Sequence, residues 1–168
     1  TNMFGQLSFN VLAESAEQGI IVDVYGLDGY DDDGTPNMEE DFTPEDLVLD
    51  FTGDFITDSS LGNVVTRPDK RSNIKGYTAK GNDYYFAANM RAYLRIPEDG
   101  WYTFHFGAQG SNVVMNLDGV EIFKVYDRWN NMQRKENRIY LTAGDHEWSL
   151  KWYAFRWVGD LEFKVNID

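Results

Sequence analysis

The C-terminal half of the chain alternates between apolar and polar residues with a period of two. In residues 91–96 the apolar positions are Ala92, Leu94 and Ile96. The same spacing recurs in residues 101–106, 113–117, 148–152 and 161–167. Because successive side chains of a β-strand point to opposite faces, each run predicts a strand with one buried and one solvated face.

Short turn sequences separate these runs. Residues 97–100 read Pro-Glu-Asp-Gly, in which proline fixes one φ angle and glycine accepts a positive one. The pair Asp118 and Gly119 is a strong hairpin signal, and the alternation resumes at Val120 and Ile122. Such runs predict an all-β fold, either an antiparallel β-sandwich or a jelly-roll-like barrel.

The N-terminal half is less regular. Residues 9–12, 20–25 and 48–55 are predicted strands, and residues 26–46 a long acidic loop in which a Thr-x-x-Asp pattern predicts one capped helical turn at 43–46. Residues 57–82 are polar and rich in turn formers. At 168 residues, with 42% apolar and 15% aromatic residues, residues 1–168 are predicted to form a single domain with a sizeable core.

Charge excludes one class of partner. The formal net charge is −13, and residues 1–66 hold fifteen carboxylates but no lysine or arginine. Such a surface repels phosphate backbones, so no nucleic acid partner is expected. No apolar run approaches the roughly 18 residues that span a bilayer, so no membrane insertion is expected. The chain begins with Thr1 and has no visible signal peptide, which we interpret as a fragment of a larger extracellular or cell-surface protein.

Catalytic motifs are missing from the sequence. It has no cysteine, no Gly-x-Ser-x-Gly nucleophile turn and no phosphate-binding glycine loop. The two histidines, His105 and His146, lie in different predicted strands and have no evident histidine partner for zinc. Among 28 acids, carboxylate pairs arise by chance, and a small sandwich rarely offers the deep cleft that glycoside hydrolysis needs. The prediction is a non-enzymatic protein.

Several motifs resemble a known family. Residues 94–104 read LRIPEDGWYTF, residues 117–119 read LDG, and residues 141–146 read LTAGDH. With the strand at 19–25 and the Asp-x-Trp at 127–129, they resemble the β-sandwich domain family named after the anthrax toxin protective antigen, over most of residues 19–168. The resemblance implies a module attached to bacterial glycosidases, adhesins, toxins or yeast flocculins, several of which bind sugars.

One departure from the family pattern concerns calcium. Such sugar-binding members hold calcium with two consecutive aspartates, joined by a cis peptide bond, in the loop after the Tyr-Thr-Phe strand. Residues 107–112 here read Gly-Ala-Gln-Gly-Ser-Asn, which offers no carboxylate. Since calcium prefers several anionic or carbonyl oxygens, the family's calcium mechanism is not expected at this loop.

A second segment partly fits a calcium loop. Placing Gly34 at the sharp turn puts Asp31, Asp33 and Glu40 at ligand positions, although Gly29 then falls where a first ligand is needed. A solvated acidic loop is the favoured interpretation. Calcium held by Asp31, Asp33 and Glu40 is the alternative.

The leading hypothesis is a carbohydrate-binding or adhesin module, which recognises a glycan at one end of the sandwich. Aromatic rings stack on sugar faces, and amides and guanidinium groups bind hydroxyls or acidic substituents. Trp157 and Trp129 are the candidate aromatic platforms, with burial as the alternative for each, whereas Trp148 and Trp152 are expected in the core. The candidate polar contacts are Gln109, Ser111, Asn112, Asn130, Asn131 and Arg156, the last toward an anionic glycan. The alternative function is a structural or protein-interaction spacer that binds no sugar.

Overall fold

The computed structural model describes residues 8–10, 20–26, 48–55, 64–65, 86–127, 131–154 and 161–167, in which every regular element is a β-strand. No helix in this part of the chain is long and apolar enough to cross a membrane. The strands are β1 (Ser8–Asn10), β2 (Ile20–Gly26), β3 (Val48–Phe55), β4 (Val64–Val65), β5 (Phe86–Ile96), β6 (Gly100–Ala108), β7 (Ser111–Leu117), β8 (Val120–Tyr126), β9 (Gln133–Leu141), β10 (Gly144–Ala154) and β11 (Leu161–Ile167).

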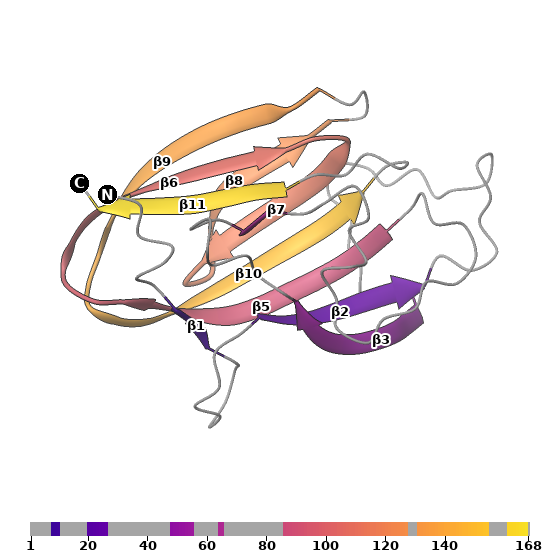
Figure 1. Cartoon of the computed structure of the whole chain (residues 1–168), viewed down its shortest axis with the longest axis horizontal. Coiled ribbons are helices and arrows are strands. Elements are labelled where there is room, and N and C mark those ends of the chain that lie inside the picture. Colours follow the sequence, from indigo (N-terminus) through magenta and orange to yellow (C-terminus); the bar gives the residue numbers. More distant parts are fainter. Residues whose placement is uncertain are drawn as a thin grey trace.

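Two antiparallel sheets face each other (Figure 1). The larger has the order β3-β2-β5-β10-β7-β8, with β1 added to β5. The smaller has the order β4-β11-β6-β9. The long β5–β10 pairing, from Phe86 with Ala154 to Ile96 with Gly144, forms the middle of the larger sheet. The predicted β-sandwich is therefore confirmed.

The inner faces of both sheets form one core. The predicted inward positions of β5, β6, β7, β10 and β11 are buried, and Trp148 and Trp152 are 2% and 0% exposed, as expected. Aromatic contacts join the two layers: the ring centroids of Trp148 and Phe163 lie 6.1 Å apart, and those of Phe106 and Phe123 lie 5.4 Å apart. Stacked aromatic pairs of this kind add to the stabilisation that buried area gives.

Two sequence predictions need correction. Val120 and Ile122 continue the alternation in sequence, but Val120 is 64% exposed, and Phe123 and Val125 are the buried residues of β8. The β7–β8 register shifts between Met115 and Asn116, and such an irregularity changes which residues face the core. In addition, residues 64–65, in the segment predicted as turn-rich, pair with β11 as the short strand β4.

Side chains join the edges of the two sheets where β8 and β9 run past each other. The amide of Asn137 on β9 donates to the carbonyl oxygen of Ile122 on β8 at 3.1 Å. The ammonium of Lys135 donates to the carbonyl oxygen of Lys124. These bonds satisfy carbonyl groups on an edge strand, which would otherwise offer a template for pairing with another chain.

One end of the sandwich carries the tight turns, and we call it the turn end. Asp118 and Gly119 have φ angles of 51° and 77°, as a primed hairpin turn requires. The turn is bonded to β10: the N–H of Asp118 donates to the carbonyl of Glu147 at 2.7 Å, and the N–H of Glu147 donates to Oδ1 of Asp118 at 2.9 Å. The predicted hairpin is confirmed.

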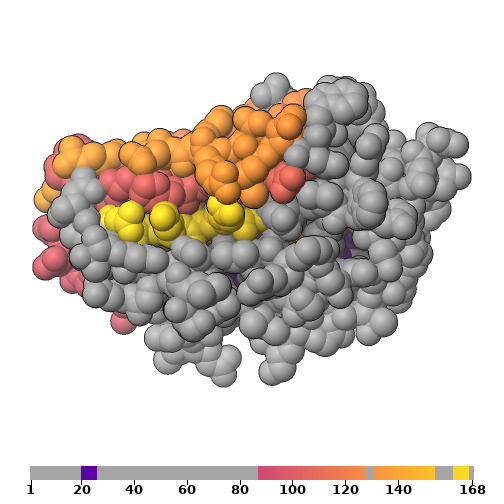
Figure 2. Space-filling model, turned by 45° about the horizontal axis from the view of Figure 1, so that its top comes forward, coloured from indigo at the N-terminus to yellow at the C-terminus, as the bar shows by residue number. Residues whose placement is uncertain are grey.

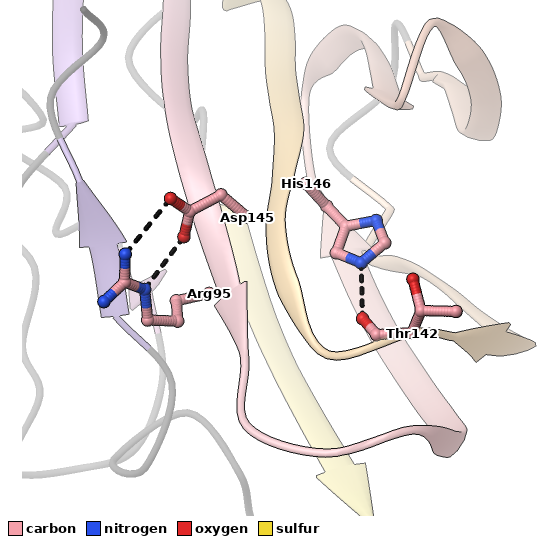
Figure 3. A network of polar contacts seen from close by, with 4 residues as sticks. All are labelled: Arg95, Thr142, Asp145 and His146. Atoms are coloured by element: carbon pink, nitrogen blue, oxygen red, sulfur yellow. Dashed lines mark hydrogen bonds and ion pairs between the residues drawn. The ribbon is translucent and has the colours of Figure 1, made fainter. Parts of the chain in front are cut away.

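His146 and Asp145 point to opposite sides of β10 at the same end (Figure 3). Nε2 of His146 lies 2.7 Å from the carbonyl oxygen of Thr142, and Nδ1 contacts the carboxylate of Asp118. Asp145 accepts two hydrogen bonds from the guanidinium of Arg95, which lower the pKa of its carboxyl group. Because the ion pair of Arg95 and Asp145 is exposed to solvent, it adds little to the stability of the fold.

Glycine at position 119 is expected to be required for its backbone conformation. A Cβ at Gly119 or at Gly100 would meet nothing within 4 Å, but Gly119 has a φ of +77°. Gly119→Ala should therefore lower the free energy of unfolding by about 1 kcal/mol, the cost of a left-handed conformation for a residue with a side chain. Gly100→Ala is the matched control and should be near neutral. Equal effects in urea denaturation would contradict the assignment.

Stability is expected to depend on the protonation of His146. Partial burial of the ring lowers its pKa, but the hydrogen bonds to Asp118 and Thr142 outweigh this and raise the pKa above its ordinary value. The stabilisation is then complete below about pH 6.5, the ordinary value, and is lost as the pH rises through the raised value. Denaturation between pH 6 and pH 9 should show this loss in the wild type but not in His146→Gln. Identical pH profiles of the two proteins would contradict it.

Candidate functional site

The strand ends that flank the predicted ligand loops lie at the end of the sandwich opposite the turn end, and we call it the loop end. The turn between β6 and β7 spans residues 109–110, and the connection between β8 and β9 begins at Asp127. The segment 155–160 starts and ends beside the first turn, because Ala154 pairs with Ser111 and Leu161 pairs with Ala108. The strands β6, β8 and β10 all end here, at the right of Figure 1.

The carboxylate of Asp127 ties two of these connections together. It is 5% exposed, and its Oδ2 accepts hydrogen bonds from the N–H of Gly110 at 2.8 Å and from the N–H of Asn131 at 2.9 Å. The N–H of Asp127 donates to the carbonyl of Ser111 at 2.9 Å. Gly110 has a φ of 56°, which turns its N–H toward the carboxylate at low steric cost. The 109–110 turn is thus fixed relative to Asn131.

Ser111 lies beneath this surface. Its hydroxyl donates to the carbonyl of Gln109 at 2.9 Å and accepts from Nε1 of Trp152 at 3.1 Å. Ser111 and Asn112 are both 0% exposed. This differs from the direct glycan contact that the sequence predicts for them, because alternation along β7 cannot reveal which polar residues the turn covers. The bond to Gln109 makes Ser111 a support for the turn, whereas Asn112 follows it on β7 and faces the opposite side of the sheet.

The other predicted contacts fall into two groups. Gln109 is half-buried and Asn131 is exposed, and Asp127 holds the backbone beside both of them. Trp129, Asn130, Arg156 and Trp157 lie outside the described residues, as do Asp31, Asp33 and Glu40. Their roles stay predictions from the sequence.

The described donors at the loop end do not fit a calcium ion. Gln109 and Ser111 are neutral, and Oδ2 of Asp127 already accepts two N–H groups. The peptide bonds of the described residues are all trans, and no cluster of three carboxylate or imidazole groups lies among them. A hard cation needs more oxygen ligands than this arrangement offers.

One known protein family matches the sequence. The profile of the PA14 domain, the protective-antigen-like domain, matches residues 52–146, more than half of the sequence. The chain belongs to the PA14 domain family. No curated protein matches the sequence at a significant level.

Solved PA14 domains share its fold. The PA14 domain of the MpAFP antifreeze protein is 16% identical with a TM-score of 0.59, and the match covers 94% of this chain and 88% of that one. The PA14 sugar-binding domain of an RTX adhesin is 13% identical with a TM-score of 0.59, over 91% and 90% of the two chains. The epithelial adhesin 9 A domain of Candida glabrata, solved with Galb1-3GlcNAc, is 14% identical with a TM-score of 0.57, over 96% and 88%.

Larger enzymes contain the same fold as one part. A β-glucosidase of Kluyveromyces marxianus, solved with glucose, is 14% identical with a TM-score of 0.60. The match covers 99% of this chain but 18% of the enzyme, so this chain spans less than a fifth of that protein. At these identities the likeness shows the fold alone.

Asp127 is the buried loop-end residue that the sequence does not mark as part of the candidate site. The sequence marks it only as the first residue of the Asp-x-Trp motif at 127–129, and a lone aspartate after a strand usually faces solvent. Its burial, and its two N–H partners far apart in sequence, become visible only once β6, β7 and β8 are placed together.

Loss of the Asp127 carboxylate is expected to loosen the loop end. Asp127→Ala leaves two N–H groups without their charged acceptor and should lower the free energy of unfolding by about 2 kcal/mol. Asp127→Asn, which keeps one acceptor oxygen, should cost less. The matched control is Asp99→Ala, which removes an exposed carboxylate that accepts the N–H of Ala143 at 2.7 Å and should cost less still. If Asp127→Ala and Asp99→Ala lower the free energy of unfolding equally, burial of the hydrogen bonds at Asp127 does not add to stability.

Proposed function

We propose that this PA14 domain is a non-catalytic carbohydrate-binding module that takes a glycan at the loop end. The observation that carries the proposal is the Asp127 clamp, which holds the 109–110 turn against Asn131. A fixed arrangement of polar groups lowers the entropic cost of binding a flexible sugar. The related RTX adhesin domain is a sugar-binding domain, and the related Candida glabrata domain was solved with Galb1-3GlcNAc, which supports the same class of ligand.

The chemistry of the loop end suits hydroxyl groups. The amides of Gln109 and Asn131 each offer two donors and one acceptor, so they match hydroxyls that donate and accept. In the proposal, Ser111 supports the turn from below, and Trp129 and Trp157 supply stacking surfaces from the flanking segments. Asn130 adds a further amide, and Arg156 would engage an acidic substituent.

The proposal includes the setting of the domain. We infer that it is one part of a larger extracellular or cell-surface protein, in keeping with the adhesins and the β-glucosidase that share its fold. In such a chain the module holds its parent protein on a glycan surface, while any catalysis resides elsewhere. Calcium bound by Asp31, Asp33 and Glu40 stays a separate hypothesis, on which the loop-end contacts do not depend.

Glycan binding is expected to require the loop-end amides. Titration calorimetry against neutral and acidic oligosaccharides should give heat with the wild type, with and without chelator. Gln109→Ala combined with Asn131→Ala should raise the Kd for the glycan at least tenfold, because each buried hydroxyl contact contributes about 1 kcal/mol. Asn116→Ala, an amide on β7 away from the loop end, is the matched control.

The alternative is a spacer or protein-interaction domain that binds no sugar. The burial of Ser111 and Asn112 is the observation in its favour, since it leaves fewer polar groups at the surface. An absence of heat with every glycan, from a folded wild-type protein, would reject the sugar-binding proposal and leave the spacer.

A further inference from the structure

A groove of about 470 Å³ lies on the outer face of the smaller sheet, next to the loop end, and none of its lining residues is a proposed loop-end contact. Figure 2 shows this face, with β9, β6 and β11 side by side and open to the viewer. Polar and charged residues line it: His105 from β6, Arg134 and Glu136 from β9, and Glu162 and Lys164 from β11. The volume is within the range of ordinary ligand sites.

Gly107 forms the floor of the groove. A Cβ at this position would lie 3.2 Å from Oε2 of Glu162 and 3.2 Å from Sδ of Met132. Since Gly107 pairs with Arg134 on one side and Glu162 on the other, its missing side chain lets these two meet across β6. The guanidinium donates to both carboxylate oxygens, at 3.2 and 3.4 Å.

His105, the next outward residue of β6, also contacts both neighbouring strands. Nδ1 of His105 lies 3.1 Å from Oε2 of Glu136 on β9, and its Nε2 lies 2.9 Å from Nδ2 of Asn166 on β11. The groove therefore presents acceptors and donors at fixed positions, although the side chains of Arg134 and Glu136 stay 67% and 64% exposed. Sugar hydroxyls need both kinds of group.

An aromatic platform lies further along β6. Trp101 and Tyr140 are 46% and 53% exposed, and with Val120 they are the exposed large hydrophobic residues of the described part. Their rings meet edge to face at 5.5 Å, and the guanidinium of Arg138 lies 4.5 Å from the centre of the Trp101 ring. From Trp101 to Gly107 is six residues, about 20 Å of strand. That length suits an extended polymer.

The charge of this face differs from that of the whole chain. Arg134, Arg138 and Lys164 supply three positive charges, and Glu136 and Glu162 supply two negative ones, so the local balance is +1. The whole chain carries −13. A polyanion is repelled by most of the molecule, so its binding would depend on this local surface.

We propose that the outer face of β6, β9 and β11 is a second ligand site, which takes an acidic polysaccharide along β6 from the Trp101 and Tyr140 platform to the groove above Gly107. Sugar faces stack on the exposed rings, and carboxylate or sulfate groups pair with Arg134, Lys164 and Arg138. The carboxylates of Glu136 and Glu162 accept sugar hydroxyls. This site borders the loop end at Gly107 but uses different residues, and it requires neither Asp127 nor the segment 155–160.

The test uses the whole chain with heparin and polygalacturonate as acidic probes and dextran as a neutral one. Calorimetric titration at 150 mM salt should show an acidic probe bound by the wild type. Arg134→Gln with Lys164→Gln, and Trp101→Ala with Tyr140→Ala, should each raise the Kd at least tenfold. Arg95→Gln is the matched control, because it removes an exposed arginine and an exposed ion pair from the other sheet.

The outcomes separate this site from the loop end. Loss in both face variants, with binding kept in Arg95→Gln and in Asp127→Ala, supports the proposal even if neutral glycans fail to bind. No acidic probe bound by the folded wild type would overturn it. So would equal weakening in Arg95→Gln, which indicates unspecific charge attraction, or loss confined to Asp127→Ala, which assigns the acidic ligand to the loop end. Circular dichroism and the melting temperature of each variant verify its folding.

Discussion

The structure depends on the burial of two alternating faces against each other. Each of the two sheets must bury the apolar side chains of its inner face, and neither sheet can do so alone. Trp148 with Phe163, and Phe106 with Phe123, join the layers by direct ring contact. Because the ladder satisfies the backbone of these strands internally, the turns and the outer faces are left to carry polar groups that meet other molecules.

Aspartates then fix the connections in the same manner at both ends. Asp118 binds the N–H of Glu147, Asp99 binds the N–H of Ala143, and Asp127 binds the N–H groups of Gly110 and Asn131. A carboxylate is well suited to this task, since it is compact and its hydrogen bonds to N–H groups are stronger than those of a neutral acceptor. The buried one, Asp127, holds the loops proposed to bind sugar, so a structural bond and a functional geometry coincide there.

The sequence predicts those features that follow from local chemistry. The strands β6, β7, β10 and β11, the second half of β5, the Asp118 hairpin and the buried Trp148 and Trp152 follow from alternation and turn preference. The polar strand β9 shows no such alternation and is not predicted over most of its length. Prediction from the sequence fails where pairing between distant strands decides which residues are buried and which segments form strands. The register shift beside Met115 makes Phe123 and Val125 the buried residues of β8, and the short strand β4 exists through its pairing with β11. Ser111 is buried, with its hydroxyl bonded to the carbonyl of Gln109. No local pattern contains these facts.

Gly107 shows how topology changes the meaning of a residue. In sequence it opens the segment proposed as a ligand loop, yet it lies inside β6 with Arg134 and Glu162 on its flanks. Because Gly107 has no side chain, Arg134 and Glu162 from the two neighbouring strands pair across β6 beside the groove. Because the outer face of a sheet needs no apolar residues for stability, it can retain such a groove and an exposed Trp101 without weakening the core. A face of that kind is therefore free to acquire a ligand of its own, independent of whatever the loops bind.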